Sequence, residues 1–281
     1  MLTTTDHDRD KAGLTYVYPV ISRRAGGLSI GINLNINNAC NWRCVYCQVP
    51  NLKRGSAPPI NFDTLGSELR NFLSDVIHGD FYDREEVNDE MRIIKDIAIS
   101  GNGEPTTSAE FDQVVNLIST VMDEFGLSNN INFVLITNGS MLNRKFVQNG
   151  LKKMSKAGGE VWFKIDSASR EGQALINNVR GSGVSSLKKL HLSANLCPTW
   201  IQSCFFSWKN RQPAVREIDA YISLLDAVEQ NAIPIKGVML YGVARQSMQK
   251  EAEHISALPE AWFIKLAERL QKYNFDIRIN P

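Results

Sequence analysis

The segment LSIGINLNINNACNWRCVYCQ, residues 28–48, joins a β-like stretch to three closely spaced cysteines. Leu28 to Leu34 has the apolar content of a strand, and it feeds directly into Cys40, Cys44 and Cys47. The spacing is C-x3-C-x2-C, with the aromatic Tyr46 just before the last cysteine. One short loop can therefore wrap three thiolates around a small inorganic group.

Three local thiolates favour an iron–sulfur cluster over a closed zinc site. A [4Fe–4S] cube contains four irons, so three cysteines leave one iron without a protein ligand. An open metal position is where a substrate or cofactor binds, as catalytic zinc sites also show. A structural zinc site needs a fourth ligand, and the next candidates after Cys47 are His78 and Cys197. A zinc-stabilised adaptor stays as the alternative.

The composition of the 281 residues excludes several classes of protein. The chain has 31 basic and 30 acidic residues, so it carries no global field for nucleic acid. Five cysteines, three of them clustered, are typical of a reducing compartment, and we expect a cytoplasmic protein. Residues 1–11 lack the apolar core of a signal peptide, and no apolar run is long enough to span a membrane.

Hydrophobic periodicity predicts strands that alternate with helices. Strands are expected at 28–34, 93–100, 131–136, 161–165, 200–206 and 235–241, and helices at 61–77, 107–125, 142–156, 185–196, 214–229 and 259–273. This alternation favours βα units and a parallel sheet with both faces covered. It does not by itself separate a partial (β/α)6 barrel from a doubly wound sheet.

The domain organisation is expected to be simple. Residues 1–15 form a polar, flexible N-terminal segment, and residues 16–281 form a single domain without a break in composition. Residues 78–92 are acidic and irregular, so we expect a surface excursion there. Residues 107–110 have the form of a capping box, and Asn61 or Asp63 is expected to cap the first helix.

Polar and glycine-rich residues follow the predicted strands, where barrels and parallel sheets place their chemistry. Ser100–Pro105 offers glycines for close backbone approach and the carboxylate of Glu104, although such a segment alone is an ordinary turn. Thr137–Ser140 is either a turn at a helix entry or a polar contact. Asp166 and Ser167 are either ribose contacts or a helix N-cap.

Three further residues have no settled role. Cys204 shares a strand face with Gln202, and as a free cysteine it is more often a buried core thiol than a hydrogen-atom donor. Cys197 has no evident partner. Arg245 is either a bidentate grip for a carboxylate or phosphate, or a solvated loop arginine.

The cysteine spacing, the aromatic residue and the Gly101–Glu104 turn one strand later resemble the signature of the radical S-adenosylmethionine (SAM) superfamily. The resemblance implies a partial (β/α)6 TIM-like barrel of the α/β class. It implies a [4Fe–4S] cluster on Cys40, Cys44 and Cys47 and reductive cleavage of SAM to a 5′-deoxyadenosyl radical. It also implies an electron donor such as a flavodoxin or ferredoxin. The SAM contacts carried over are Tyr46, Gly101, Gly103, Glu104, Asn138, Asp166 and Ser167.

Within the superfamily, the chain is similar to the wyosine-synthetase-like group, over about residues 16–270. The similarity lies in residues 18–24, 30–34, 47–48, 101–106, 137–140, 164–166, 200–202 and 241–245. It implies tRNA or another RNA as a partner, and the aromatic and basic stretch 208–211 is the best candidate contact. The tRNA enzymes carry a second cluster on upstream cysteines, whereas no cysteine precedes Cys40 here.

Two other functions remain open from the sequence. A radical SAM enzyme that acts on a peptide or small molecule keeps the same motifs. A non-enzymatic iron–sulfur redox sensor or binding module would hold a cluster without affinity for SAM. The Gly101–Glu104 turn favours an enzyme over both the sensor and the zinc adaptor.

Overall fold

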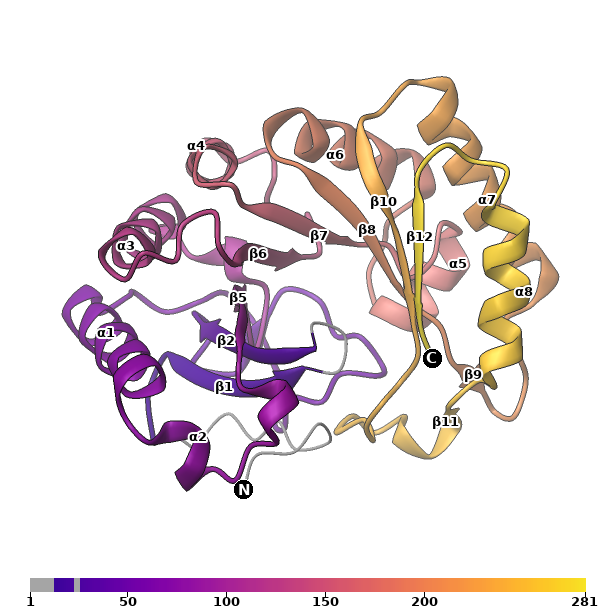
Figure 1. Ribbon diagram of the computed structural model, residues 1–281. Coiled ribbons are helices and arrows are strands. Elements are labelled where there is room, and N and C mark those ends of the chain that lie inside the picture. The colour runs from indigo at the N-terminus through magenta and orange to yellow at the C-terminus, as the bar shows by residue number, and fades with distance from the viewer. Residues whose placement is uncertain (1–12, 23–25) are drawn as a thin grey trace.

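A curved, mostly parallel sheet of eight strands organises the molecule in the computed structural model, which describes residues 13–22 and 26–281. The strand order is β1-β2-β5-β6-β7-β8-β10-β12. The bounds are β1 Val17–Ser22, β2 Gly27–Asn33, β5 Ile94–Ser100, β6 Asn132–Thr137, β7 Glu160–Lys164, β8 Thr199–Cys204, β10 Ile235–Tyr241 and β12 Asp276–Asn280. Figure 1 shows the strands arranged as an incomplete barrel.

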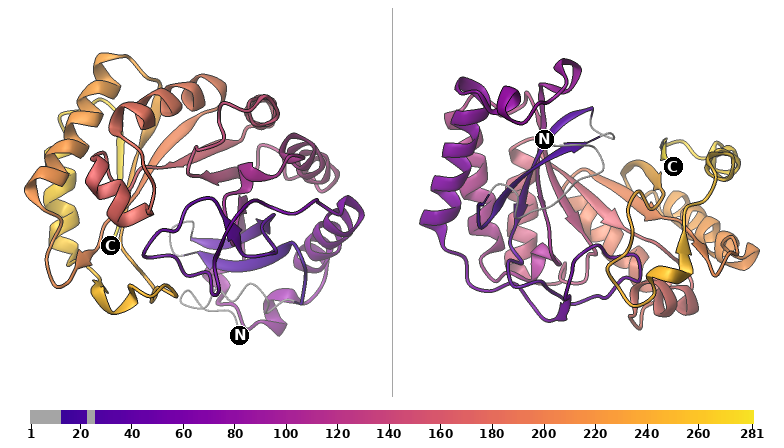
Figure 2. Two further views of the ribbon diagram at one scale, coloured as in Figure 1. Left: turned by 180° about the vertical axis from the view of Figure 1, so that it is seen from behind. Right: turned by 90° about the horizontal axis from the view of Figure 1, so that it is seen from below.

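Helices cover the outer face of this sheet, and both views in Figure 2 place them outside the strands. The long helices are α1 Phe62–His78, α3 Phe111–Glu124, α4 Lys145–Lys156, α6 Gly183–Leu196, α7 Val215–Gln230 and α8 Glu260–Leu270. Each follows one strand and precedes the next, which confirms the predicted βα alternation. The α/β class and the partial barrel are therefore confirmed.

The two edge strands were not predicted from the sequence. β1 pairs antiparallel with β2, and its register sets Pro19 opposite Ile30. Proline has no backbone N–H to donate and is tolerated mainly on edge strands. Its presence therefore weakens the sequence signal for a strand here. β12 pairs parallel with β10 and lies at the other edge of the sheet. The six predicted strands are all present, within one or two residues of their predicted ends.

The principal hydrophobic core lies between the sheet and its helices. Alternate residues of the central strands, such as Ile97, Ile99, Leu135 and Phe163, are fully or almost fully buried and belong to this core. The other residues of the strands face the barrel interior, where Ala98, Ile136 and Lys164 line a cavity. Because successive side chains of a strand point to opposite faces, residues that pack against the helices alternate with residues that line the cavity.

Two local expectations need correction. Residues 78–92 are not wholly irregular, because they contain the short helix α2 Phe81–Arg84 and the 3-10 turn η1 Asp89–Met91. The capping box at 107–110 does not form. Helix α3 begins after Glu110, whose carboxylate instead accepts a hydrogen bond from the Ile60 backbone N–H at 2.8 Å. The Asn61 cap of α1 is confirmed, since its side chain accepts from Thr64 N at 3.0 Å.

Candidate active site

The carboxyl ends of the parallel strands open into one cavity of about 560 Å³. The three cysteines of the loop after β2 line it, together with residues that end β5, β6, β7 and β10. The interior side chains of β1, β2 and β12 complete its wall. The cavity therefore lies at the carboxyl ends of the strands, where the sequence predicts the functional site.

Short backbone contacts shape the cysteine loop. Cys40 ends the strand β3 Ala39–Cys40, which pairs with β4 Lys53–Arg54, and Cys47 N donates to Cys44 O at 3.0 Å. Burial raises the pKa of Cys40 and of Cys44 to about 12. Both thiols must lose a proton to bind a metal, and a bound metal drives that loss. Among the described residues, no three His, Cys, Asp or Glu side chains are grouped as a site for a single metal ion.

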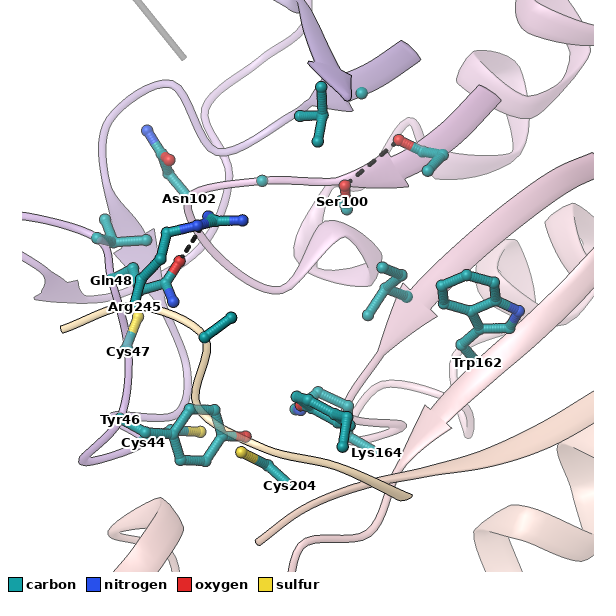
Figure 3. Close-up of a pocket in the computed structure, with 18 of the residues that line it drawn as sticks. Cys44, Tyr46, Cys47, Gln48, Ser100, Asn102, Trp162, Lys164, Cys204 and Arg245 are labelled. Atoms are coloured by element: carbon teal, nitrogen blue, oxygen red, sulfur yellow. Dashed lines mark hydrogen bonds between the residues drawn. The ribbon is translucent and has the colours of Figure 1, made fainter. Parts of the chain in front are cut away.

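A segment after β10 clasps this loop from the other side of the barrel. Met248 N donates to Cys47 O at 2.9 Å, and Ser247 Oγ donates to Val45 O at 2.6 Å. Arg43 forms a bidentate ion pair with Glu251, with distances of 2.6 and 2.8 Å. Figure 3 shows the hydrogen bond from Arg245 to Gln48 on this side of the cavity. The positions of the cysteines are thus fixed by residues about 200 positions away.

The turn after β5 lies directly against the cysteine loop. Asn102 Nδ2 donates to Asn38 Oδ1 at 2.6 Å. Gly101 has a φ of +133°, and a Cβ at Gly103 would collide with the Ala39 carbonyl oxygen, so this approach requires glycine. After β6, Asn138 Nδ2 donates to Asn41 Oδ1 at 2.9 Å. Residues on both sides of Cys40 therefore contact the predicted SAM-binding turns.

Glu104 places a buried carboxylate in the cavity wall. Its oxygens accept hydrogen bonds from Thr106 N at 3.1 Å, Thr137 Oγ1 at 2.6 Å and Asn138 N at 2.7 Å. Burial raises the pKa of Glu104, and these hydrogen bonds oppose that shift. The Thr106 hydroxyl also donates to it, so four fixed donors orient the carboxylate as a preorganised acceptor for a cationic group.

A second group of ionisable side chains lies lower in the cavity, and Figure 3 shows Cys44, Tyr46, Cys204 and Lys164 there. Lys164 Nζ donates to Tyr241 Oη at 2.5 Å and lies 3.5 Å from Asp166 Oδ1. Burial lowers the pKa of Lys164, but the Asp166 carboxylate and neighbouring groups raise it further, so the net shift is upward. The lower part of the cavity thus holds the largely buried Lys164 amine beside the fully buried Asp166 carboxylate.

The structure separates the predicted SAM contacts into two sets. Tyr46, Gly101, Gly103, Glu104 and Asn138 line the cavity together with Cys40, Cys44 and Cys47. Asp166 and Ser167 follow the end of β7, but the cavity lining of the described chain does not include them. The Asp166 side chain is fully buried, and Ser167 Oγ donates to Glu217 at 3.0 Å. Their contact with ribose stays a prediction.

Some site residues were not selected from the sequence. Lys164 entered the sequence analysis only within the segment 164–166, with no role of its own. Asn177, which hydrogen-bonds to Cys44, is the last residue of the short π-helix η3 Gln173–Asn177, in the connection between β7 and α6. Only the sequence position of Lys164, two residues before Asp166 on a period-two strand, carried a usable signal.

The residues with open roles lie in different places. Cys204 lines the cavity but is 1% exposed, and Arg245 lies at its mouth. Cys197 is buried, and its thiol donates to Gly159 O at 3.3 Å. Gln202 is buried within β8. The predicted segment 1–15 lies largely outside the described residues, as do Arg23 and Arg24 of the similarity to the wyosine group.

The comparison with known families decides the assignment of the site. The profile of the Radical SAM superfamily matches residues 34–201, which include the cysteine loop and the turns after β5 and β6. The chain belongs to the radical SAM superfamily. Proteins of this superfamily are enzymes that use a [4Fe–4S] cluster and SAM.

Solved structures share the fold at low sequence identity. SuiB of Streptococcus suis, bound to its precursor peptide SuiA, has a TM-score of 0.58 and 15% identity, over 92% of this chain and 49% of that chain. TYW1 with a lysine-pyruvate adduct has a TM-score of 0.58 and 16% identity, over 88% of this chain and 74% of that chain. A radical SAM methyltransferase from Sphaerobacter thermophilus has a TM-score of 0.59 and 8% identity, over 94% of this chain and 68% of that chain.

A curated relative matches a smaller part. GTPase Obg of Brachyspira hyodysenteriae is 28% identical over 133 residues, which are 47% of this chain and 17% of that protein. This chain thus spans about a sixth of that relative and about half of SuiB. In the described part of the chain, no helix combines the length and apolarity that crossing a membrane requires.

Proposed function

We propose that Cys40, Cys44 and Cys47 ligate the [4Fe–4S] cluster and that the turns after β5 and β6 bind SAM beside it. The observation that carries this proposal is the contact between the two parts. Asn38, Ala39 and Asn41, which flank Cys40, touch Asn102, Gly103 and Asn138. Three thiols and a preorganised carboxylate at one cavity fit a cluster with one open iron and a ligand that carries an ammonium group.

Each part of this chain has a defined task in the proposed reaction. The Glu104 carboxylate binds the ammonium group of SAM, and the Gly101–Gly103 backbone allows that approach. Tyr46 and Asn138 line the wall beside it, and Asp166 and Ser167 remain the proposed ribose contacts. The bound cluster and SAM together supply the radical that takes a hydrogen atom from the substrate. The barrel orients the reactants and excludes water and oxygen.

Anaerobic reconstitution with iron and sulfide tests the proposal. We expect the wild type to form 5′-deoxyadenosine from SAM under dithionite. Cys40→Ala, Cys44→Ala and Cys47→Ala should each abolish this product and lower the iron content. Cys197→Ser, which changes a thiol outside the cavity, should retain both. Full cluster loading in the three loop variants would contradict the assignment.

For the substrate, we propose an RNA. The sequence similarity to the wyosine-synthetase-like group supports this class. A half-exposed Trp208, which packs edge-on against His254 at 5.6 Å, and the exposed Lys209 and Arg211 offer stacking and charge near the mouth. The proposal concerns one cluster, at Cys40, Cys44 and Cys47. The reductant is expected to be a flavodoxin or ferredoxin.

Binding of a tRNA pool tests the RNA class. We expect retention of tRNA that weakens steeply as salt rises, as phosphate contacts require. Trp208→Ala with Lys209→Ala should reduce binding about tenfold or more, as expected for one lost stacking contact. Retention of tRNA at the same level in this variant, or no retention by the wild type, would favour a peptide or small-molecule substrate.

A further inference from the structure

A side-chain amide from outside the cysteine loop holds the sulfur of Cys44. Asn177 Nδ2 lies 3.2 Å from Cys44 Sγ and 2.8 Å from Asp166 Oδ2. An amide NH₂ carries two hydrogens, so it donates to the sulfur and to the carboxylate at the same time. The distance to the carboxylate is in the usual range for an N–H···O hydrogen bond, and the distance to the sulfur is within hydrogen-bond reach.

The backbone beside Asn177 fixes the loop on both sides of the same cysteine. Arg43 N donates to Asn177 O at 3.2 Å, and Val45 N donates to Ile176 O at 2.8 Å. Asn177 is the last residue of the π-helix η3 Gln173–Asn177, and it is 1% exposed. Wide helical turns of this kind are frequent at functional sites. The side chain is therefore held in place, with water excluded.

Asp166 determines which end of the Asn177 amide faces the sulfur. Its carboxylate accepts from Tyr46 Oη at 2.5 Å, from Cys204 N at 3.0 Å and from Asn177. A carboxylate that accepts from the amide must face its NH₂ group and not its carbonyl oxygen. The second hydrogen of that NH₂ group is then directed at Cys44 Sγ.

We infer that Asn177 is a positioning residue that sets the reduction potential of the cluster through its hydrogen bond to Cys44. This inference rests on the proposed ligation of the cluster by Cys40, Cys44 and Cys47. Hydrogen bonds to cluster sulfurs are among the factors that determine cluster potentials. A donor at the sulfur stabilises the additional negative charge of the reduced cluster, so it makes the potential more positive. Asp166 acts one step further out, because it orients the donor.

The test compares loaded proteins and needs no turnover. Asn177→Leu keeps the volume of the side chain but removes the donor, and Asn177→Ala serves if the leucine variant fails to fold. Each variant is reconstituted anaerobically, and its iron content is matched to that of the wild type. The midpoint potential is measured without SAM by an electrochemical titration monitored by electron paramagnetic resonance. We expect a shift to more negative potential in both variants.

Asn178→Gly is the matched control. Asn178 Nδ2 donates to Arg43 O at 2.8 Å, so it ties the same loop without contact to a sulfur. Its φ is +54°, which glycine adopts without strain. We expect its potential to equal that of the wild type. An unchanged potential in a loaded Asn177 variant, or the same shift in Asn178→Gly, would overturn this inference but leave the proposed cluster ligation intact. A wild type that binds no cluster would overturn the proposed ligation as well.

Discussion

At the scale of single residues, the sequence reveals the ligands but not the groups that support them. Cys40, Cys44 and Cys47 are close in the chain, so spacing alone brings them to one cavity. Asn177 lies 133 positions from Cys44, and only the fold brings the two together. Asp166 was predicted as a ribose contact because it ends a strand. That contact stays a prediction. The structure adds that the carboxylate accepts from several buried donors, an arrangement that sequence spacing does not reveal.

Replacement of Glu104 by glutamine is expected to weaken SAM binding without preventing cluster loading. In the wild type, Asn138 N donates to the Glu104 carboxylate at 2.7 Å. Glutamine removes the negative charge and places an NH₂ donor opposite this N–H group. A charge-assisted hydrogen bond contributes about 1.5–3 kcal/mol, so we expect at least about a tenfold loss of affinity. Equilibrium binding of SAM to the reconstituted protein measures it.

Glu110→Gln is the control for this variant, because Glu110 lies outside the cavity lining and accepts from Ile60 N. We expect wild-type SAM affinity there. Equal affinity in Glu104→Gln and the wild type would remove Glu104 from the proposed SAM site.

Replacement of Lys164 by methionine is expected to destabilise the fold. The Asp166 side chain is fully buried, and the variant leaves its charge without the nearby ammonium group. Removal of one partner from a buried ion pair costs about 3–5 kcal/mol. We expect the lower part of that range, because Tyr46, Asn177 and Cys204 still donate to the carboxylate.

Denaturant unfolding measures this loss, and a double-mutant cycle with Asp166→Asn isolates the pair. The double variant should lose less stability than the two single variants together. Strict additivity would show that the two side chains do not interact.

At the scale of elements, the central strands are predictable and the edges are not. Each of the six predicted strands is a run of buried residues followed by a helix of period 3.6, which is the signal that sequence patterns carry best. β1 contains Pro19 and pairs antiparallel, and β12 is short and half-exposed. Both lie at the edge of the sheet, where one missing partner weakens the pattern of burial. The failed capping box at α3 has a similar cause, since Glu110 binds the distant Ile60 N.

Alanine substitutions at two helical glycines, Gly150 in α4 and Gly66 in α1, are expected to have opposite effects on stability. A Cβ at Gly150 would lie 2.5 Å from Cε1 of the buried Phe111, and overpacking costs about 1–3 kcal/mol. A gain of about 1 kcal/mol in helix propensity does not offset this cost. We expect Gly150→Ala to lower the free energy of unfolding.

The matched variant is Gly66→Ala in α1, where a Cβ would meet the flexible end of Arg70 at 3.0 Å. That side chain can move, so the propensity gain remains, and we expect up to about 1 kcal/mol of stabilisation. Chemical denaturation of both variants gives the sign. A stabilised Gly150→Ala protein would show that α3 and α4 separate at little cost.

At the scale of the whole molecule, an incomplete barrel positions its site at one end. The strands are parallel from β2 to β12, so their carboxyl ends collect at the same rim. The cysteine loop, the glycine turn and the segment after β10 come from distant parts of the sequence and meet there. The alternation of strands and helices predicted this rim. The contacts of residues 245–251 with the cysteine loop were not predicted, because nothing in the sequence of that segment indicates which residues it packs against.

Mössbauer spectroscopy of ⁵⁷Fe-reconstituted protein, with and without SAM, tests the central claim most directly. Three cysteine ligands leave one iron of the cluster for SAM, so we predict a [4Fe–4S] spectrum in which one iron of four changes when SAM is added. A spectrum that SAM leaves unchanged would contradict the account, as would four equivalent thiolate-bound irons or the absence of a [4Fe–4S] cluster.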